Sequence, residues 1–402
     1  MLLHKDDDLS VTLNFPTQIP AEVQPESYDT EALLYGLYGG LSALQDGIAK
    51  QCLDSASPYY GAFPSESNDL TESYEGLNYS GRHSMGQTAS LAAVSGIPSK
   101  LNPAYGNRAL ITRSLLSSFC HFAAMSPDYL IRERTNSPTQ FWPMSHVFFI
   151  YPSLATSYGI LKDRVTPEEA ELWRRGLVLI GDKLANYTAS QTNQWSEIIY
   201  GHLLVYRATG EERFLRYFER AADAVAEDNL SCSGSLGQHS AGYFMESYAP
   251  SGSYQELSMH NLAAAYLNYR DLSCAKSALT QKMEDSIRRA VRYESLYWLP
   301  QPDGGVVSPT SMNLRAPTGM MSNCGYPGMF LAAIAFPEAK GLLRLLPYDA
   351  ENYSYALTMP HIALNNPALA QRVLLEGFQN KDTRVYGMGG AWTPRLYEAY
   401  AL

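Results

Sequence analysis

Hydrophobic residues recur at three- and four-residue spacing through most of the chain, which is the pattern of amphipathic helices. In residues 211–226, for example, apolar side chains stand at Phe214, Leu215, Phe218, Ala222 and Val225. The same spacing predicts helices over residues 31–51, 86–94, 108–125, 141–162, 166–186, 193–207, 211–226, 255–270, 276–297, 327–335 and 366–378.

Polar residues and glycines mark the ends of several predicted helices. Thr166 is followed by Pro167 and two acids, which combines a capping side chain, a first-turn proline and first-turn negative charge. Gly210 stands where the helix over 193–207 should stop, as expected of a glycine after a helix C-terminus. Between the predicted helices, short turns alternate with long loops.

This alternation predicts a series of helical hairpins, each of roughly 40–50 residues, although no sequence repeat is evident. We expect an all-α fold, an incomplete or complete (α/α)6–7 toroid that gathers its long loops on one face. A few short strands are predicted within 303–335, at Gly304–Pro309 and Thr310–Arg315. Residues 1–27 are expected to form an extended N-terminal arm of a single domain over 1–402.

Composition and charge narrow the function. With 46% hydrophobic and 17% charged residues, the chain is that of a folded globular protein. The formal net charge of −10 argues against nucleic acid as the main partner, whereas an anionic sugar remains possible because a few converging arginines can outweigh a negative surface. The 29 tyrosines suit either a wet, sugar-binding cleft or the rim of a core.

Cysteines and histidines indicate neither a disulfide framework nor a metal site. The five cysteines are dispersed without a Cys-x-x-Cys pair, so at most two bridges can form and free buried thiols are the simpler interpretation. The eight histidines include no His-x-x-x-His pair with an adjacent glutamate. We expect no required metal and no cofactor.

Nothing in the sequence predicts a membrane partner, because no apolar run approaches the ~20 residues that span a bilayer. The N-terminus lacks the apolar core of a signal peptide. The chain is expected to be either cytoplasmic or a secreted or periplasmic protein whose signal has been removed. Four Asn-x-Ser/Thr sequons fit secretion, and the oligomeric state stays open.

The segment Gly234–Tyr254 is the main candidate for a functional site. It is rich in Gly and Ser, separates two strongly helical segments, and carries His239, Tyr243, Tyr248 and Tyr254. Loops of this length within a compact domain are usually functional or disordered. A second candidate segment, Thr192–Ile198, contains Asn193, Gln194 and Trp195 at a predicted helix start.

These two segments resemble a motif of the α/α-toroid polysaccharide lyases, the hyaluronate, chondroitin and xanthan lyase group. That motif has an Asn-Trp segment opening a helix, a Gly-Ser-x-x-x-His stretch, and a catalytic tyrosine nine residues after the histidine. Here Asn193 and His239 are 46 residues apart and Tyr248 follows His239 by nine. The sequence departs from the motif by Gln194, which separates Asn193 from Trp195, and by ending where those lyases continue into β-sandwich domains. It is more similar in length to stand-alone alginate and glucuronan lyases, such as polysaccharide lyase family 38.

The resemblance implies β-elimination at a uronic acid. Asn193, assisted by Arg315 or Arg292, would neutralise the substrate carboxylate so that the C5 proton can be removed. Tyr248 would act as base and acid once a neighbour lowers its pKa from about 10. His239 would be that neighbour, or the base itself if the substrate geometry is anti. The remaining candidates would contact sugar: Trp195, Trp142, Tyr243, Tyr254, Gln194 and His146.

Other interpretations remain open. A glycoside hydrolase on the same toroid would use paired carboxylates, for which Glu197, Glu246 and Glu256 are eligible, although a helix-surface or loop-anchoring role is the more common one for such acids. The toroid could also bind carbohydrate without catalysis. Singly, His239 could fix the loop, Asn193 could cap a helix, and Tyr248 and Tyr254 could pin the loop to the helices.

Overall fold

The computed structural model describes most of the predicted helical region. The described residues are 4–5, 7–11, 48, 50–57, 60–63, 72–74, 77–79, 81–96, 104–123, 147–187, 189, 191–229, 236–246, 250, 252–297, 299–300, 306–307 and 327–343. The expected helix over 366–378 and most of that over 31–51 lie outside them, as do the expected strand at Thr310–Arg315 and the first part of the segment over 141–162.

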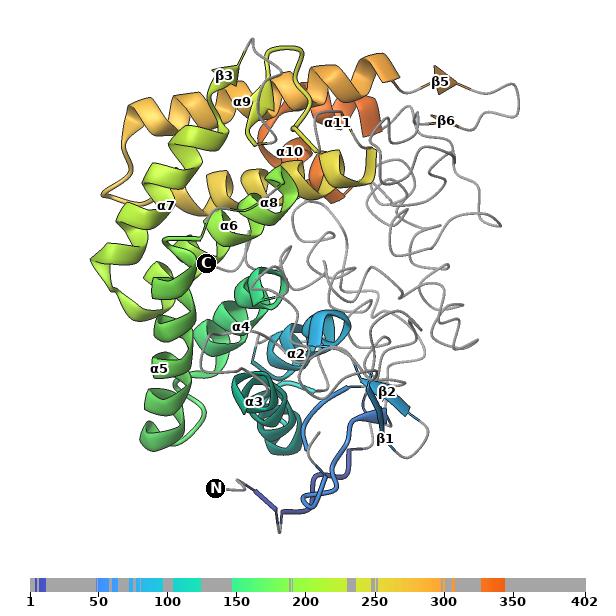
Figure 1. Ribbon diagram of the computed structural model, residues 1–402, viewed down its shortest axis with the longest axis vertical. Helices are drawn as coiled ribbons and strands as arrows, with labels where there is room; N and C mark the ends of the chain where they lie inside the picture. Colours follow the sequence, from blue (N-terminus) through green and yellow to red (C-terminus); the bar gives the residue numbers. More distant parts are fainter. Residues whose placement is uncertain are drawn as a thin grey trace, which may run out of the picture.

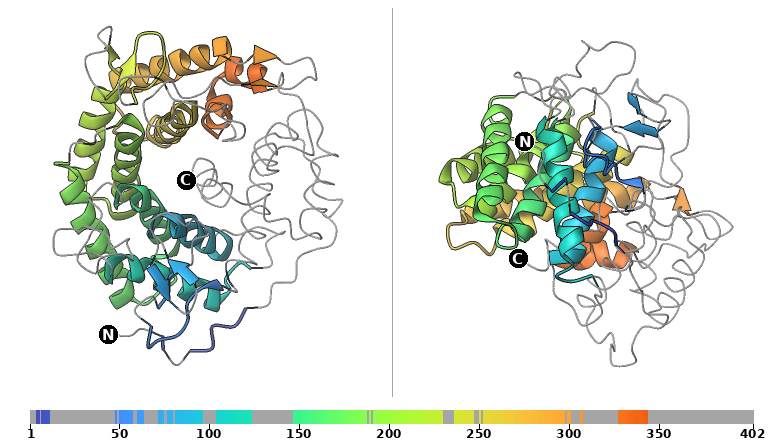
Figure 2. Two further views of the ribbon diagram at one scale, coloured as in Figure 1. Left: turned by 45° about the vertical axis from the view of Figure 1, so that its right-hand side comes forward. Right: turned by 90° about the horizontal axis from the view of Figure 1, so that it is seen from below.

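Ten helices in the described part of the chain form two layers along an arc (Figure 1). They are α2 (Gly81–Gly96), α3 (Arg108–Ala123), α4 (Val147–Leu161), α5 (Pro167–Leu184), α6 (Thr192–Thr209), α7 (Glu212–Val225), α8 (Gly252–Tyr269), α9 (Ser277–Tyr297), α10 (Pro327–Ala335) and α11 (Pro337–Leu343). Each even-numbered helix packs against the next even-numbered one and against the odd-numbered helix that follows it. Even-numbered helices thus form the inner layer, as Figure 2 shows.

Side-chain contacts show that neighbouring inner helices run parallel. Near their C-termini, Lys162 Nζ after α4 donates to the carbonyl oxygen of Ala208 in α6 (2.7 Å). Arg207 of α6 in turn donates to Asn268 Oδ1 in α8 (2.7 Å). Near their N-termini, Glu256 of α8 accepts from the backbone N–H of Gly328 in α10 (2.8 Å). The inner helices therefore present their N-termini at one end of the arc.

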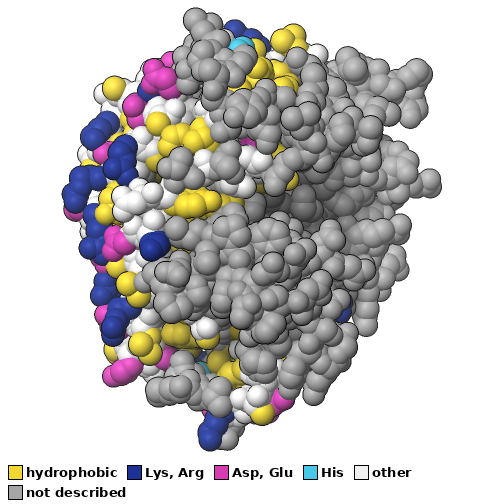
Figure 3. Space-filling view, viewed as in Figure 1, with side chains coloured by type: hydrophobic (Ala, Val, Ile, Leu, Met, Phe, Trp, Pro, Cys, Tyr) yellow, Lys and Arg dark blue, Asp and Glu magenta, His cyan; other side chains and the backbone are white. Residues whose placement is uncertain are grey.

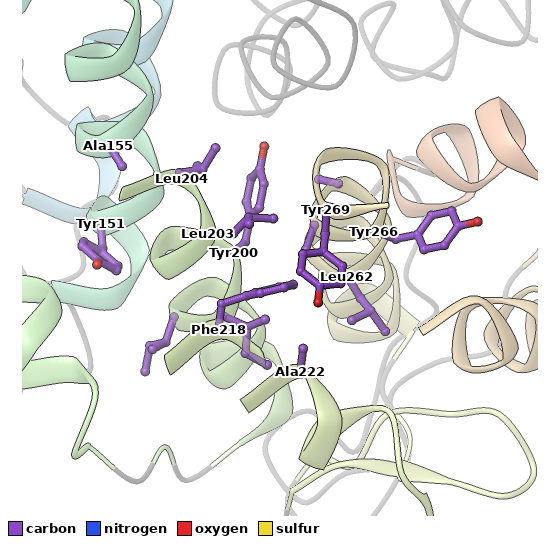
Figure 4. Packing of buried hydrophobic residues seen from close by; sticks show 14 of the residues in the cluster. Tyr151, Ala155, Tyr200, Leu203, Leu204, Phe218, Ala222, Leu262, Tyr266 and Tyr269 are labelled. Carbon is purple, nitrogen blue, oxygen red and sulfur yellow. The ribbon is translucent and has the colours of Figure 1, made fainter. Parts of the chain in front are cut away.

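The inner helix α6 and the outer helix α7 differ in burial. Fourteen of the 18 residues of α6 are buried, whereas six of the 14 in α7 are. The buried face of α7 carries Phe218, whose ring lies 5.0 Å from that of Tyr269 in α8 (Figure 4). Charged side chains occupy the outer edge over α5 and α7 (Figure 3). Sequence periodicity is therefore clearest in the outer helices.

The predicted helix ends at Thr166 and Gly210 are confirmed. Thr166 and Glu169 form a reciprocal capping box at the start of α5, which is typically worth about 1 kcal/mol. Gly210 ends α6 in the left-handed conformation, with φ of 73°. Helix α11 was not predicted, because seven residues are too few to show a helical period.

Strands are short where the structure describes them. The antiparallel pair β1 (Glu72–Tyr74) and β2 (Leu77–Tyr79) was not expected, whereas β6 (Val306–Val307), paired with β5 (Leu299–Pro300), falls within the predicted Gly304–Pro309. A parallel pair joins β3 (Asp228–Asn229) to β4 (Gln238–His239), and only β4 lies inside the segment Gly234–Tyr254 that was expected to be irregular. That segment also ends earlier than expected, because α8 begins at Gly252 and contains Tyr254.

The described part of the N-terminal arm contacts the helices through His4 and Leu9. The His4 ring bonds to Glu169 (2.5 Å) and Asp7 (2.6 Å), and the buried Leu9 accepts through its carbonyl oxygen from Arg113 (2.8 Å). Burial of the His4 ring opposes protonation, but the bonds to the two carboxylates outweigh burial and raise its pKa. Among the described helices, none has a stretch apolar and long enough to cross a bilayer.

Candidate active site

The loop before α8 lies across the N-termini of α6 and α8. Thr192, the first residue of α6, donates its N–H to the Met245 carbonyl oxygen (3.3 Å), and its hydroxyl accepts from Gly237 N–H (3.0 Å). Gln255, in the first turn of α8, accepts from Phe244 N–H (2.7 Å). The structure therefore brings the two segments singled out in the sequence into direct contact.

The same loop is fixed to α9 of the outer layer. The Gln238 side chain is fully buried and bonds to the Ser286 hydroxyl (2.7 Å) and to the Arg289 guanidinium (2.9 Å). Gly242 lies so close to α9 that a Cβ there would be 2.1 Å from the Arg289 carbonyl oxygen, and its φ is 102°. A long loop that packs this closely is a defined element and not a loose connection.

Asn193 occupies the second position of α6 and is 1% exposed. Its backbone N–H donates to Glu246 Oε1 (2.7 Å), and its carbonyl oxygen accepts from the Ser196 hydroxyl (2.7 Å). Its side-chain Oδ1 is buried and has no hydrogen-bond partner among the described residues. The expected alternative of a helix cap does not fit, because Gln191 holds the N-cap position and the Asn193 side chain bonds no backbone N–H there.

His239 lies in β4 with one ring nitrogen committed to the loop. Its Nδ1 accepts from Ala241 N–H (3.0 Å), so the neutral ring carries its proton on Nε2. Its ring stacks on Tyr243 at 4.7 Å and 10°, and Tyr243 in turn lies 5.5 Å from Tyr293 of α9. The half-buried imidazole is therefore held in one orientation with Nε2 as a donor.

Glu256, one of the acids considered for hydrolysis, is buried and joins α8 to α10. Glu256 Oε2 accepts from Gly328 N–H (2.8 Å) and Met329 N–H (3.1 Å), the first turn of α10. Burial, and then repulsion from nearby Glu294, raises the pKa of Glu256 well above its ordinary value, against the effect of these bonds. The sequence named Glu256 only as an eligible carboxylate, and its contact with α10 follows from the packing of the helices.

The remaining predicted residues fall into two groups. Within the described residues, Trp195 and Gln194 lie in the first turn of α6, where Trp195 packs partly buried against the core and Gln194 is buried. Tyr254 is half-buried in the first turn of α8, and Arg292 is exposed on α9. Four others lie outside the described residues, namely Tyr248, Arg315, Trp142 and His146.

The three acids considered for hydrolysis are all buried rather than on a helix surface: Glu197 is 1%, Glu246 0% and Glu256 4% exposed. Glu246 and Glu256 each accept from backbone N–H groups in the first turn of a neighbouring inner helix. Both therefore anchor one segment to another. Where residues are described, no group of three or more His, Cys, Asp or Glu is arranged to hold a metal ion.

Comparison with known proteins relates this fold to two lyases. A chondroitin AC lyase of Streptomyces coelicolor A3, in complex with chondroitin sulphate, matches with TM-score 0.55 and 12% identity over 92% of this chain. A mutant of that enzyme gives 0.52 and 12% over 90%, and a Paenibacillus xanthan lyase 0.51 and 10% over 88%. This chain spans 47%, 46% and 32% of their respective lengths.

No protein-family model and no curated protein matches the sequence. At 10–12% identity the likeness to the lyases concerns the fold. The mostly helical α/α-toroid class expected from the sequence is thereby confirmed, and the chain is a structural neighbour of the chondroitin AC and xanthan lyases.

Proposed function

We propose that this chain is a polysaccharide lyase that cleaves a uronic-acid-containing polymer, such as alginate or glucuronan, by β-elimination. The observation that carries the proposal is that two polar groups with fixed positions lie in contacting segments at one end of the inner layer. Asn193 has a fixed backbone and a buried side-chain oxygen without a partner among the described residues, and His239 has a fixed ring with Nε2 as its donor. Such preorganised groups suit a substrate on which negative charge develops.

Asn193 would bind the uronate carboxylate through its amide N–H groups. Removal of the C5 proton places a second negative charge next to that carboxylate, so donors aimed at it lower the barrier. The N-terminal turn of α6 adds a favourable partial positive charge, which Glu246 partly offsets. Arg292 or Arg315 would supply the remaining positive charge.

His239 would act as a hydrogen-bond donor and not as the base. Its Nδ1 is occupied by Ala241 N–H, so Nε2 carries the proton in the neutral ring and cannot accept one. A donor beside a tyrosine stabilises the phenolate and lowers the phenol pKa. This assignment favours Tyr248 as the group that removes the C5 proton and returns it to the C4 oxygen.

Tyr248 enters this proposal through the sequence motif and through chain connectivity. It follows Glu246 by two residues in the sequence. Glu246 is itself bonded to Asn193. Trp195, Trp142, Tyr243, Tyr254, Gln194 and His146 are proposed to contact the sugar chain. Because the substrate is a polymer, we infer a secreted or periplasmic location.

The experiment is a panel of uronans incubated with the purified chain, with absorbance at about 235 nm and product mass as readouts, because elimination leaves a C4–C5 double bond conjugated to the carboxylate. We expect the absorbance to rise with at least one polymer and Tyr248→Phe to abolish the rise. New reducing ends without absorbance would indicate a hydrolase instead. Absence of product from every polymer would contradict catalysis, and full activity of Tyr248→Phe would overturn the assigned tyrosine.

A further inference from the structure

A continuous series of buried hydrogen bonds runs through the backbone of Asn193. Glu246 Oε1 accepts from Asn193 N–H (2.7 Å), the Ser196 hydroxyl donates to the Asn193 carbonyl oxygen (2.7 Å), and Asn261 Nδ2 donates to the Ser196 oxygen (3.0 Å). All four residues are at most 2% exposed. The series joins the loop before α8, the first turn of α6 and the middle of α8.

From this series we propose that Glu246 is a positioning residue that sets the orientation of Asn193. The inference rests on the proposed function. It gives Glu246 a role different from that of a hydrolase carboxylate, because Glu246 acts through the backbone of Asn193 and not on the substrate.

The first turn of α6 depends on Glu246 because it lacks a cap of its own. Gln191 occupies the N-cap position without a side-chain bond to the helix. A buried N–H left without an acceptor is unfavourable, and a carboxylate near a helix N-terminus also benefits from the helix dipole. Glu246 supplies this acceptor from 53 residues along the chain. Loop and helix are therefore fixed relative to each other.

The bonds of Thr192 reinforce this coupling. Its hydroxyl and N–H bond to Gly237 and Met245, which flank the loop turn that carries His239. Two groups of the proposed site, Asn193 and His239, thus share one anchor region. If Glu246 is truncated, the Asn193 backbone N–H loses its acceptor. The first turn of α6 can then shift, and the Asn193 side-chain amide shifts with it. A displacement of about 1 Å in a catalytic group is enough to reduce a rate ~100-fold.

The experiment compares Glu246→Ala with Glu246→Gln, which keeps an acceptor oxygen at the same position. Glu219→Ala is the matched control, because Glu219 is also a buried acid, and it accepts from Tyr269 and Lys276 at the opposite end of the inner helices. Initial rates on the uronan that the wild type cleaves give kcat and KM separately. Hydrogen exchange followed at the Asn193 amide provides a readout that needs no activity.

We expect Glu246→Ala to lower kcat about 100-fold with KM changed less than about threefold, and Glu246→Gln to recover most of the rate. Asn193 amide exchange should accelerate in Glu246→Ala and stay unchanged in Glu219→Ala, which should retain kcat. Retained kcat in Glu246→Ala, or equal losses in Glu246→Ala and Glu219→Ala, would overturn the positioning role. If the wild type cleaves no uronan, the proposed function fails, and unchanged exchange in Glu246→Ala would separately refute the anchor.

Discussion

Both ends of the inner helices carry buried polar side chains, but the two ends differ in how these side chains are hydrogen-bonded. At the C-terminal end, the connection between α8 and α9 is short, and Tyr269, Glu219 and Lys276 satisfy one another through hydrogen bonds of 2.5–2.9 Å. At the N-terminal end, a long loop crosses two helices and Asn193 Oδ1 is left buried without a partner among the described residues.

The polar groups at the C-terminal end stabilise the fold, whereas Asn193 Oδ1 at the N-terminal end does not. A buried polar atom without a partner is unfavourable by about 1–3 kcal/mol, so folding alone gives no reason to place one there. The backbone of Asn193, by contrast, is hydrogen-bonded through both its N–H and its carbonyl oxygen. The N-terminal end therefore combines firm anchoring of the chain with an unsatisfied side chain, which is the arrangement expected of a site that binds a polar ligand.

The largest expected effect is on Asn193. Asn193→Ala should lower kcat/KM by about 100- to 1000-fold, as removal of one preorganised donor does elsewhere. Its melting temperature should stay equal or rise, because the change removes a buried oxygen that has no partner among the described residues. Paired rate and thermal-unfolding measurements test this. A large loss of stability together with activity would instead assign Asn193 to the fold and weaken the contrast between the two ends.

The second effect concerns two glycines with positive φ, one at each end. Gly242→Ala should destabilise the protein by about 3 kcal/mol or more, because a Cβ there would meet the Arg289 carbonyl oxygen at 2.1 Å. Gly210→Ala serves as the matched control and should be destabilising by about 1 kcal/mol only, since no atom lies within 4 Å of its Cβ position. Denaturant unfolding measures both. Equal losses of stability in Gly242→Ala and Gly210→Ala would mean that the loop at Gly242 can move away from α9 at little cost.

The smallest effect is the pH dependence contributed by Glu256. Its pKa is raised in the folded state above the ordinary 4.5, so the folded protein binds more protons than the unfolded chain. Its contribution to stability is therefore present below pH 4.5 and is lost as pH rises through the folded pKa. Glu256→Gln should flatten this decline in unfolding midpoints measured between pH 5 and 8.

The control for this pH series is Glu171→Gln, which removes an exposed acid paired with Arg174. The hydrogen bonds from Arg174 lower the pKa of Glu171. Glu171 therefore contributes to the pH dependence of stability in the opposite direction, and only weakly because it is solvent-exposed. A wild-type midpoint that does not fall with rising pH would show that Glu256 stays ionised in the folded state.

Helix positions were largely predictable because helix formation depends on neighbours three and four residues apart. The expected helix at 327–335 has the bounds found for α10, and the capping residues at Thr166 and Gly210 behave as expected. Prediction was weaker where packing imposes order without a period, as in the β3–β4 pair and in the docked residues of the N-terminal arm. The single-domain organisation and the roles of the candidate site residues remain predictions.

The sequence by itself determined the series of helical hairpins, the long loop before α8, and the spacing of Asn193, His239 and Tyr248, since these follow from local pattern and chain order. Tertiary structure alone decided that Glu246 bonds to Asn193 from 53 residues away, that Glu256 accepts from the first turn of α10, and that Ala241 N–H donates to His239 Nδ1. The physical reason is that a polar group's role depends on which groups surround it once water is excluded. Those neighbours come from helices that are distant in sequence and meet only when the two layers pack.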